Sequence, residues 1–221
     1  MGIHNITGVT DSRVAYVCAE ILKQHEGQCL IVAPSFIHAK RLVADLSFFL
    51  DAKIYLLPSD EETLIHFEAK NRDALLERLS ILPALASGEP CIVVAPANQV
   101  IKKLPPKEVF LSNVRLLTIG QDLDRDQFAR ALVFMGYERV PMVFAKGQFC
   151  IRGGLLDIYP PDREQPVRIE FFDTEIETIK NFDTETQRSG AAQKDVRIVP
   201  AELVIGDDNA FAQAEKSIRH R

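Results

Sequence analysis

The sequence lacks the features of membrane and secreted proteins. No apolar run is long enough to cross a bilayer, and the N-terminus has no basic segment followed by an apolar one. The four cysteines form no CxxC pair and lie in apolar stretches, where cysteine behaves as a small hydrophobic residue. We therefore expect a protein of the reducing cytoplasm, with no membrane contact.

The sequence also lacks the signals of several functional classes. Its formal net charge of -5 gives no basic surplus for sequence-independent binding to DNA. Its five histidines show no metal-ligand spacing with cysteine, so no metal site is predicted, and no G-x-S-x-G elbow occurs. What is present is an ordinary globular balance, with 47% hydrophobic and 26% charged residues in 221.

The first half of the chain alternates strand and helix patterns. Apolar runs at 29–33 and 91–95, each followed by proline, are typical of strands buried on both faces of a parallel sheet. Further strands are predicted at 3–6 and 54–57. Helices are predicted at 12–22, 37–50, 68–86 and 98–103. This order predicts a three-layer α/β subdomain.

The second half has the pattern of an antiparallel α+β domain. A helix is predicted at 124–135, and Gly136 ends it. Strand patterns follow, separated in several places by turns that contain glycine or proline. They lie at 140–144, 148–152, 155–159, 167–172 and 175–182. Another element begins at 201, with a helical pattern at 211–218.

A degenerate phosphate-binding loop lies between the first predicted strand and helix. Compared with G-V-T-G-x-G-K-T, the chain keeps Gly8 but has Asp11 and Arg13 at two glycine positions. Val14 replaces the lysine that reaches the phosphates, and Ala15 replaces the magnesium ligand. We therefore predict that this loop is non-functional.

A helix cap is the simpler interpretation of this segment. Asp11 and Ser12 both suit a helix N-cap. The acidic residues at 60–62 follow Pro58 and Ser59 and lie outside a strand, so they do not form a Walker B motif. No catalytic residues and no cofactor are expected, and the chain is predicted not to be an enzyme.

A long ordered series of motifs characterises the second half. The motifs are GYERV at 136–140, RGGLLDIYPP at 152–161, VRIEFFDTEIE at 167–177, FD at 182–183 and TQR at 186–188. The series resembles the module shared by the excinuclease protein UvrB and the bacterial transcription-repair coupling factors (Mfd). The resemblance extends back through LLERLSILPALASGEPCIVVAP at 75–96 to the degenerate loop.

Two departures from UvrB favour the Mfd family. The phosphate-loop residues are lost, and Phe67 is the only aromatic residue between Leu57 and Leu75, where UvrB carries a tyrosine-rich DNA-gripping hairpin. The resemblance implies three parts: a UvrB domain 1-like α/β subdomain at 1–114, a domain 2-like α+β domain that interacts with the excinuclease protein UvrA at 115–199, and the start of a segment returning to the first subdomain at 200–221. It also implies that the parent protein is an ATP-dependent DNA translocase, which binds RNA polymerase and DNA through other domains. We expect the chain to be a monomer.

Two predicted strands present polar and aromatic side chains away from the core. In one, Arg168, Glu170 and Phe172 alternate with apolar residues and so share the outer face. In the other, Cys150 and Arg152 are expected to point outward in the same way. Arginine and aromatic residues together on a sheet face have the composition of an interaction hot spot.

The resemblance assigns roles to this face. It implies that Arg152, Arg168 and Phe172 contact UvrA, and that Asp157 and Glu170 orient the arginines. The simpler alternative is that Phe172 packs under a loop and Arg168 forms a surface ion pair with Glu170 or Asp157, worth only about 0–1 kcal/mol.

Three functions remain open on the sequence. The favoured one is a non-catalytic module that binds UvrA and recruits nucleotide excision repair to stalled RNA polymerase. The others are a nucleotide-dependent enzyme with an unusual loop and a DNA-binding module, either of which would make the chain a fragment of a UvrB-type helicase.

Overall fold

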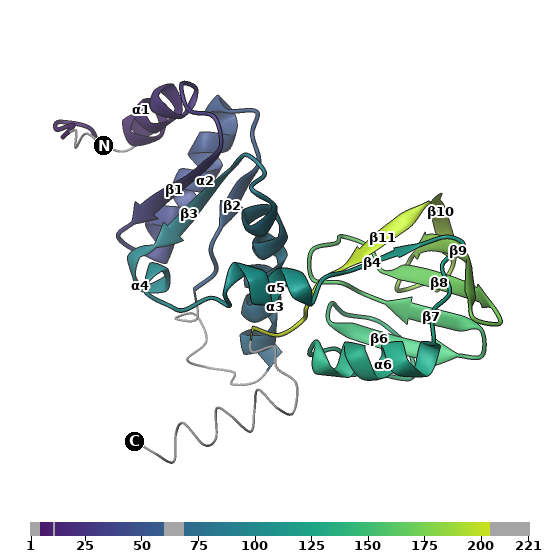
Figure 1. Cartoon of the computed structure of the whole chain (residues 1–221). Helices are drawn as coiled ribbons and strands as arrows, with labels where there is room; N and C mark the ends of the chain where they lie inside the picture. Colours follow the sequence, from purple (N-terminus) through teal and green to yellow (C-terminus); the bar gives the residue numbers. More distant parts are fainter. Residues whose placement is uncertain (1–4, 11, 60–68, 204–221) are drawn as a thin grey trace, which may run out of the picture. The chain divides into compact units, whose positions relative to one another are not determined.

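A computed structural model describes residues 5–10, 12–59 and 69–203 (Figure 1). Asp11, the acidic segment at 60–62 and the helix predicted at 211–218 lie outside the described residues. The chain is a mixed α/β protein with parallel and antiparallel sheets, divided into two compact units. One unit comprises Met1–Ala74 and Ile81–Lys103, and the other comprises Leu75–Ser80 and Leu104–Arg221. No helix in the described ranges is long and apolar enough to span a membrane.

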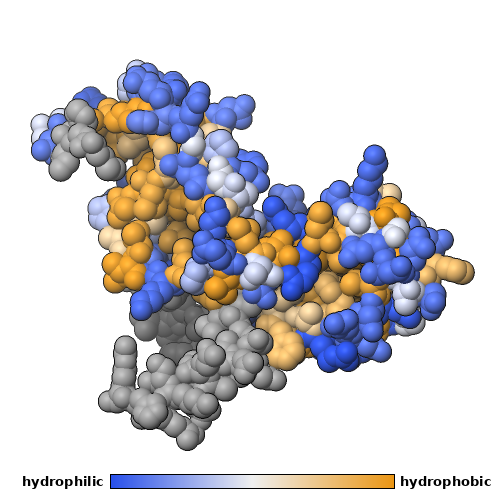
Figure 2. All heavy atoms as spheres, in the orientation of Figure 1, coloured by the Kyte–Doolittle hydropathy of each residue, from blue (hydrophilic) through white to orange (hydrophobic). Residues whose placement is uncertain are grey.

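The first unit contains a parallel sheet of three strands, in the order β1-β3-β2. These strands are β1 (Gln28–Ala33), β2 (Ile54–Leu56) and β3 (Cys91–Pro96). All six residues of the central strand β3 are buried, as predicted. The same prediction for β1 is wrong, because β1 is an edge strand that leaves Leu30 and Val32 exposed. Figure 2 shows hydrophobic surface over this edge.

The helices of the first unit pack on both faces of β3. They are α1 (Ser12–Leu22), α2 (Phe36–Phe49), α3 (Ala69–Ser87, whose residues 75–80 belong to the second unit) and the short α4 (Ala97–Val100). Ile92 and Val94 of β3 pack with α1 and α2, whereas Val93 and Ala95 pack with Ile81 of α3. Residues 5 and 6 form no strand, so the described part of the strand predicted at 3–6 is wrong.

Helix α1 buries a different face from the one its larger apolar residues suggest. Ala15 and Ala19 are fully buried in one cluster with Ala39 of α2, whereas Val14 and Ile21 are exposed. Small side chains let two helix backbones approach closely, and larger residues are then displaced to the flanks. The position that would carry a magnesium ligand in a phosphate loop is therefore a packing position here.

The second unit is built on a six-stranded sheet in the order β10-β9-β8-β7-β6-β5, beside a two-stranded ribbon of β11 and β4. Only the β5–β6 pair is parallel among the strand pairs of the described part of this unit. The strands are β4 (Arg115–Thr118), β5 (Glu138–Arg139), β6 (Gln148–Arg152), β7 (Leu155–Ile158), β8 (Val167–Phe172), β9 (Glu175–Phe182), β10 (Ser189–Gln193) and β11 (Asp195–Ile198). The helices, besides residues 75–80 of α3, are α5 (Lys107–Ser112) and α6 (Arg125–Phe134).

In the second unit the predictions for α6, β6, β7, β8 and β9 are confirmed, the strand predicted at 140–144 is wrong, and α5, β4, β5, β10 and β11 were not predicted. Helix α6 has Asp124 as N-cap and Met135 as C-cap, which confirms the helix predicted at 124–135. The backbone N–H groups of Gln127 and Asp126 both donate to Asp124 Oδ1. These hydrogen bonds, the one from Gln127 first, lower the pKa of the Asp124 carboxyl. The strand predicted at 140–144 is wrong, because this segment is a loop whose Val143 is buried against Cys150 and Phe182.

The turn after α6 requires glycine for two separate reasons. Gly136 has φ +86°, a conformation that residues with a side chain rarely adopt. A Cβ placed there would overlap with Cβ of Glu202 and lie 3.1 Å from the carbonyl carbon of Ala201. The returning chain is held at this point, since Ala201 N–H donates to Met135 O at 2.7 Å.

We predict that Gly136→Ala destabilises the protein more than Gly120→Ala does. Gly120 has φ +82°, but a Cβ there would meet only Glu175 Oε1 at 4.0 Å, so its substitution carries about 1–2 kcal/mol of backbone strain alone. Gly136→Ala adds overpacking against Ala201 and Glu202, which costs a further ~1–3 kcal/mol. Urea denaturation of both variants measures the difference, and equal losses would contradict the close approach.

Candidate protein-interaction site

The register of the six-stranded sheet brings the predicted site residues onto one face. Residues directly opposite each other in neighbouring strands point to the same side of a sheet. One row across the strands contains Cys150, Asp157, Arg168 and Lys180. The next row contains Arg152, Leu155, Glu170 and Thr178.

The alternation predicted for β8 is confirmed. Its apolar residues at alternate positions are buried, whereas Arg168 and Glu170 are partly exposed. Phe172 is 76% exposed, so it does not pack under a loop. This excludes the part of the simpler alternative in which Phe172 packs under a loop.

Asp157 is the centre of the polar contacts on this face. Its side chain is 1% exposed. Arg168 donates to both carboxylate oxygens, from Nε at 2.7 Å and from Nη2 at 2.9 Å. Arg152 Nη2 donates to the same carboxylate at 2.9 Å. The buried charge therefore has three charge-assisted donors, an arrangement stronger than that of neutral hydrogen bonds.

Arg168 is fixed from three sides. Besides Asp157, it donates from Nη1 to the carbonyl oxygen of Gln187 at 3.0 Å. Its guanidinium carbon lies 4.8 Å from the ring centroid of Phe182, a cation–π distance. The hydrogen bond to Asp157 raises the pKa of Arg168. With 12% of its side chain exposed, Arg168 lies at the base of the surface, whereas the Arg152 side chain is 42% exposed.

Glu170 forms no hydrogen bond or ion pair with Arg152 or Arg168. Its Oε2 accepts from Thr178 Oγ1 at 2.7 Å and from Lys180 Nζ at 3.1 Å. These two hydrogen bonds, the one from Thr178 first, lower the pKa of Glu170. The expectation that Glu170 orients an arginine is therefore wrong in this structure, because β9 supplies its partners and Asp157 already holds both guanidinium groups.

A loop covers one end of this face. Cys150 lies in the same row as Asp157, but it is buried with Val143 and Phe182 rather than pointing to solvent as predicted. Its Sγ donates to Pro141 O at 3.1 Å, and burial raises the pKa of the thiol. The sequence pattern placed Val143 in a strand that is a loop here, and it gave no reason to place Gln187 beside Arg168.

The turn between β6 and β7 has only two residues, Gly153 and Gly154. Gly153 has φ +57°, which suits a tight hairpin. Its carbonyl accepts from Arg125 Nη1 at 2.6 Å, and the guanidinium carbon of Arg125 lies 5.6 Å from the ring centroid of Phe171. Gly154 O accepts from Phe171 N–H at 2.8 Å. These contacts fix the strand end that carries Arg152.

The segment 8–15, compared above with a phosphate-binding loop, leads into helix α1. Gly8 has φ +74°, Arg13 and Val14 are exposed, and Ala15 is buried in the core. Asp11 lies outside the described residues. Within the described ranges, no group of three or more acidic, histidine or cysteine side chains is placed to hold a metal ion.

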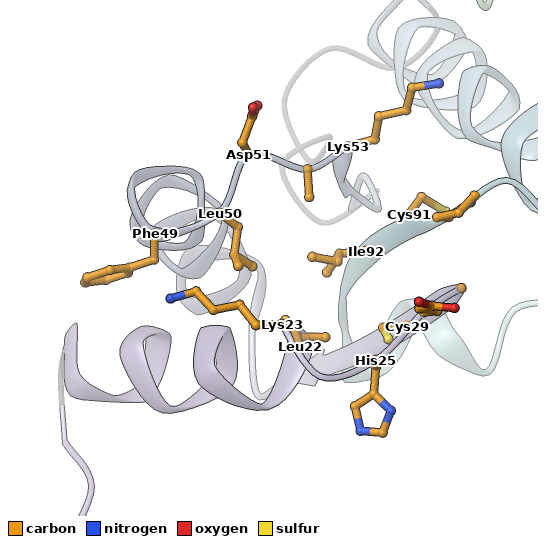
Figure 3. Close-up of a pocket in the computed structure, with 14 residues that line it drawn as sticks. Leu22, Lys23, His25, Cys29, Phe49, Leu50, Asp51, Lys53, Cys91 and Ile92 are labelled. Atoms are coloured by element: carbon orange, nitrogen blue, oxygen red, sulfur yellow. The ribbon is translucent and has the colours of Figure 1, made fainter.

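A separate cavity of about 690 Å³ lies at the amino ends of β1 and β3 (Figure 3). Leu22, Leu50 and Ile92 contribute apolar surface to it. The lysines on its rim, Lys23 and Lys53, are already in ion pairs. Ligands of open α/β sheets bind at the carboxyl ends of the strands, so this cavity is not at the expected ligand position.

We predict that Arg168 contributes more than Arg152 to the free energy of unfolding. Arg168→Met leaves the buried Asp157 with one partner instead of two, and we expect a loss of about 2–4 kcal/mol in the free energy of unfolding. Arg152→Met removes a half-exposed partner and is expected to cost less than about 1 kcal/mol. Chemical denaturation separates the two, and equal losses would contradict the assignment.

Comparison with known proteins connects this face to a family. Residues 116–203 match the UvrB interaction domain family. The chain is 35% identical over 213 residues to the transcription-repair-coupling factor of Bacillus subtilis strain 168, covering 96% of this chain and 18% of the relative. It is 36% identical over 216 residues to that of Staphylococcus aureus strain Mu50, covering 97% and 18%. The chain thus spans about a fifth of the length of these relatives.

All five predicted site residues lie inside the matched range of 116–203. The match therefore covers the sheet face organised by Asp157. Residues 116–203 thus match the UvrB interaction domain family, and almost the whole chain is similar in sequence to about a fifth of the length of the transcription-repair-coupling factors.

Proposed function

We propose that this chain is a non-catalytic module that binds the excinuclease protein UvrA and, through it, recruits nucleotide excision repair to stalled RNA polymerase. The observation that supports this most is the exposed Phe172 on the same sheet face as Arg152, above the buried Asp157–Arg168 pair. Exposed aromatic residues and arginines on a fixed backbone are the usual anchors of protein interfaces.

The site residues differ in exposure and contacts, and we propose a different role for each. Phe172 and Arg152 have the exposure needed to be buried by a partner. Arg168 offers only its small exposed part, and its main task is to hold Asp157 and the strands around it. Glu170, paired with Lys180, adds a polar border to the surface. An anchor with a polar border is the common anatomy of an interface.

The proposal includes a domain layout. Residues 1–114 form a UvrB domain 1-like α/β subdomain with a degenerate phosphate loop, 115–199 form the UvrA-interacting domain, and 200–221 begin the segment that returns to the first subdomain. The parent protein is an ATP-dependent DNA translocase of the cytoplasm, which binds RNA polymerase and DNA through domains outside this chain. The chain itself acts as a monomer without a cofactor.

We predict that Phe172→Ala and Arg152→Glu each weaken binding to UvrA by at least about thirtyfold, or ~2 kcal/mol. Phe172→Ala removes the apolar anchor, and Arg152→Glu reverses the most exposed charge of the site. Isothermal titration of the 221-residue chain against UvrA measures both effects.

Matched controls come from α6 in the same unit. Arg130→Glu and Phe134→Ala change the same residue types at exposed positions outside the site. We expect both to bind within about threefold of the unchanged chain, or less than ~0.7 kcal/mol. Full affinity in both site variants, or equal losses in the controls, would place the binding surface elsewhere.

The nucleotide-binding alternative has its own test. We predict that millimolar Mg-ATP does not raise the melting temperature, because Val14 and Ala15 supply neither the cation nor the metal ligand of a phosphate loop. A ligand at 100 times its Kd would stabilise the folded state by about 2.7 kcal/mol. A clear upward shift in thermal unfolding would reinstate the alternative of a nucleotide-binding fragment.

A further inference from the structure

The segment that leads into α6 is bonded to two hairpin turns at the same end of the six-stranded sheet. The turn at 153–154 joins β6 to β7, and the turn at 173–174 joins β8 to β9. These turns follow Arg152 and Phe172, the two side chains proposed to be buried by UvrA. Residues 120–125 form hydrogen bonds with both turns, so the two proposed anchors share one support.

The turn at 173–174 is held mainly through the backbone. Leu123 N–H donates to Thr174 O at 2.9 Å, and Ile176 N–H donates to Gln121 O at 2.9 Å. Bonds between backbone groups persist when a side chain is replaced, because every residue other than proline carries the same donor and acceptor. Neither of these two bonds therefore depends on a particular side chain of the segment.

The turn at 153–154 is connected to the segment through one side chain, that of Arg125. Its Nη1 donates to Gly153 O at 2.6 Å, a charge-assisted hydrogen bond. Its guanidinium carbon lies 5.6 Å from the ring centroid of Phe171, within the range of a cation–π contact. Without Arg125, the turn would keep its own hairpin bonds and the bond from Phe171 N–H to Gly154 O, but its link to α6 would be lost.

Arg125 reaches this turn from the side opposite to the proposed binding face. Neighbouring residues of a strand point to opposite faces of the sheet. Phe171 is 9% exposed and Phe172 is 76% exposed, in agreement with this alternation. Because Arg125 lies against the ring of Phe171, it is on the inner side of the sheet. A partner bound on the outer face would bury Phe172 and Arg152 without touching Arg125.

We propose that Arg125 is a positioning residue for UvrA binding, which fixes the 153–154 turn and through it the backbone that carries Arg152. This inference rests on the proposed function. Asp157 already tethers the guanidinium group of Arg152 at its tip, and the turn holds the same side chain at its base. A side chain that is held at both ends before binding loses less conformational entropy when a partner buries it. Removal of Arg125 is therefore expected to weaken binding through Arg152.

A double-mutant cycle on UvrA affinity tests this proposal in the 221-residue chain. Arg125→Met removes the hydrogen bond and the charge but keeps an unbranched side chain. It is expected to weaken binding about fivefold, the size of the entropy cost of ordering one loosened side chain. In an Arg152→Met chain the same substitution is expected to change the affinity less than about twofold, because the side chain that Arg125 positions is gone. Isothermal titration measures the four chains.

Arg130→Met is the matched control, since Arg130 is an exposed arginine of the same helix and lies outside both turns. It is expected to leave the affinity within about twofold of that of the unchanged chain. Backbone order parameters from NMR relaxation are expected to fall at Gly153 and Gly154 in Arg125→Met and to stay the same at Thr174. Arg125→Lys replaces the planar guanidinium by a single ammonium, and in the same cycle it is expected to show a smaller loss that again disappears in the Arg152→Met chain.

Three results would overturn this inference and leave the proposed function standing. The first is an Arg125→Met chain that binds UvrA within twofold of the unchanged chain. The second is an equal loss with and without the Arg152 side chain, which would make Arg125 a direct contact or a residue of general stability. The third is an unchanged order parameter at the 153–154 turn. Failure of the unchanged chain to bind UvrA would instead overturn the proposed function, and this inference with it.

Discussion

A single buried carboxylate organises the outer face of the six-stranded sheet. Asp157 is almost inaccessible to solvent, and an ionised group in that position is tolerated only when donors replace its water. Arg168 and Arg152 supply those donors, and Arg168 is in turn held by Gln187 O and the ring of Phe182. Strands β6, β7 and β8 and the turn after β9 are thus tied together through side chains as well as through the backbone. The exposed side chains of Arg152 and Phe172, which we propose as anchors, lie on this face.

Regular strands and helices could be predicted because their residues repeat at the period of the element. The alternation in β8 identified the outward position of Phe172, and Asp124 and Gly136 marked the ends of α6. Burial by loops could not be predicted in this way, since Val143 lies in a loop whose sequence resembles a strand and Gln187 lies in a turn. The partners of Glu170 were missed for a related reason. They depend on which strand lies next to β8, and the sequence pattern of β8 does not contain that information.

In the first unit, too, the sequence pattern predicted the elements but not which of their residues are buried. The apolar run of β1 is indistinguishable from that of β3, yet β1 is an edge strand and β3 is central. In α1, Ala15 and Ala19 are buried and the larger Val14 and Ile21 are exposed, because close helix packing favours small side chains at the contact. Ala15, at the position of a magnesium ligand in a phosphate loop, contributes packing in its place.

Hydrogen–deuterium exchange of the chain with and without UvrA tests the central claim most directly, because it locates the contact without altering any residue. The account predicts slower exchange on binding at the turns 153–154 and 173–174, which adjoin Arg152 and Phe172. It predicts no change at α5, which carries none of the proposed contacts. Protection confined to the first unit, or no protection at either turn despite binding, would contradict it.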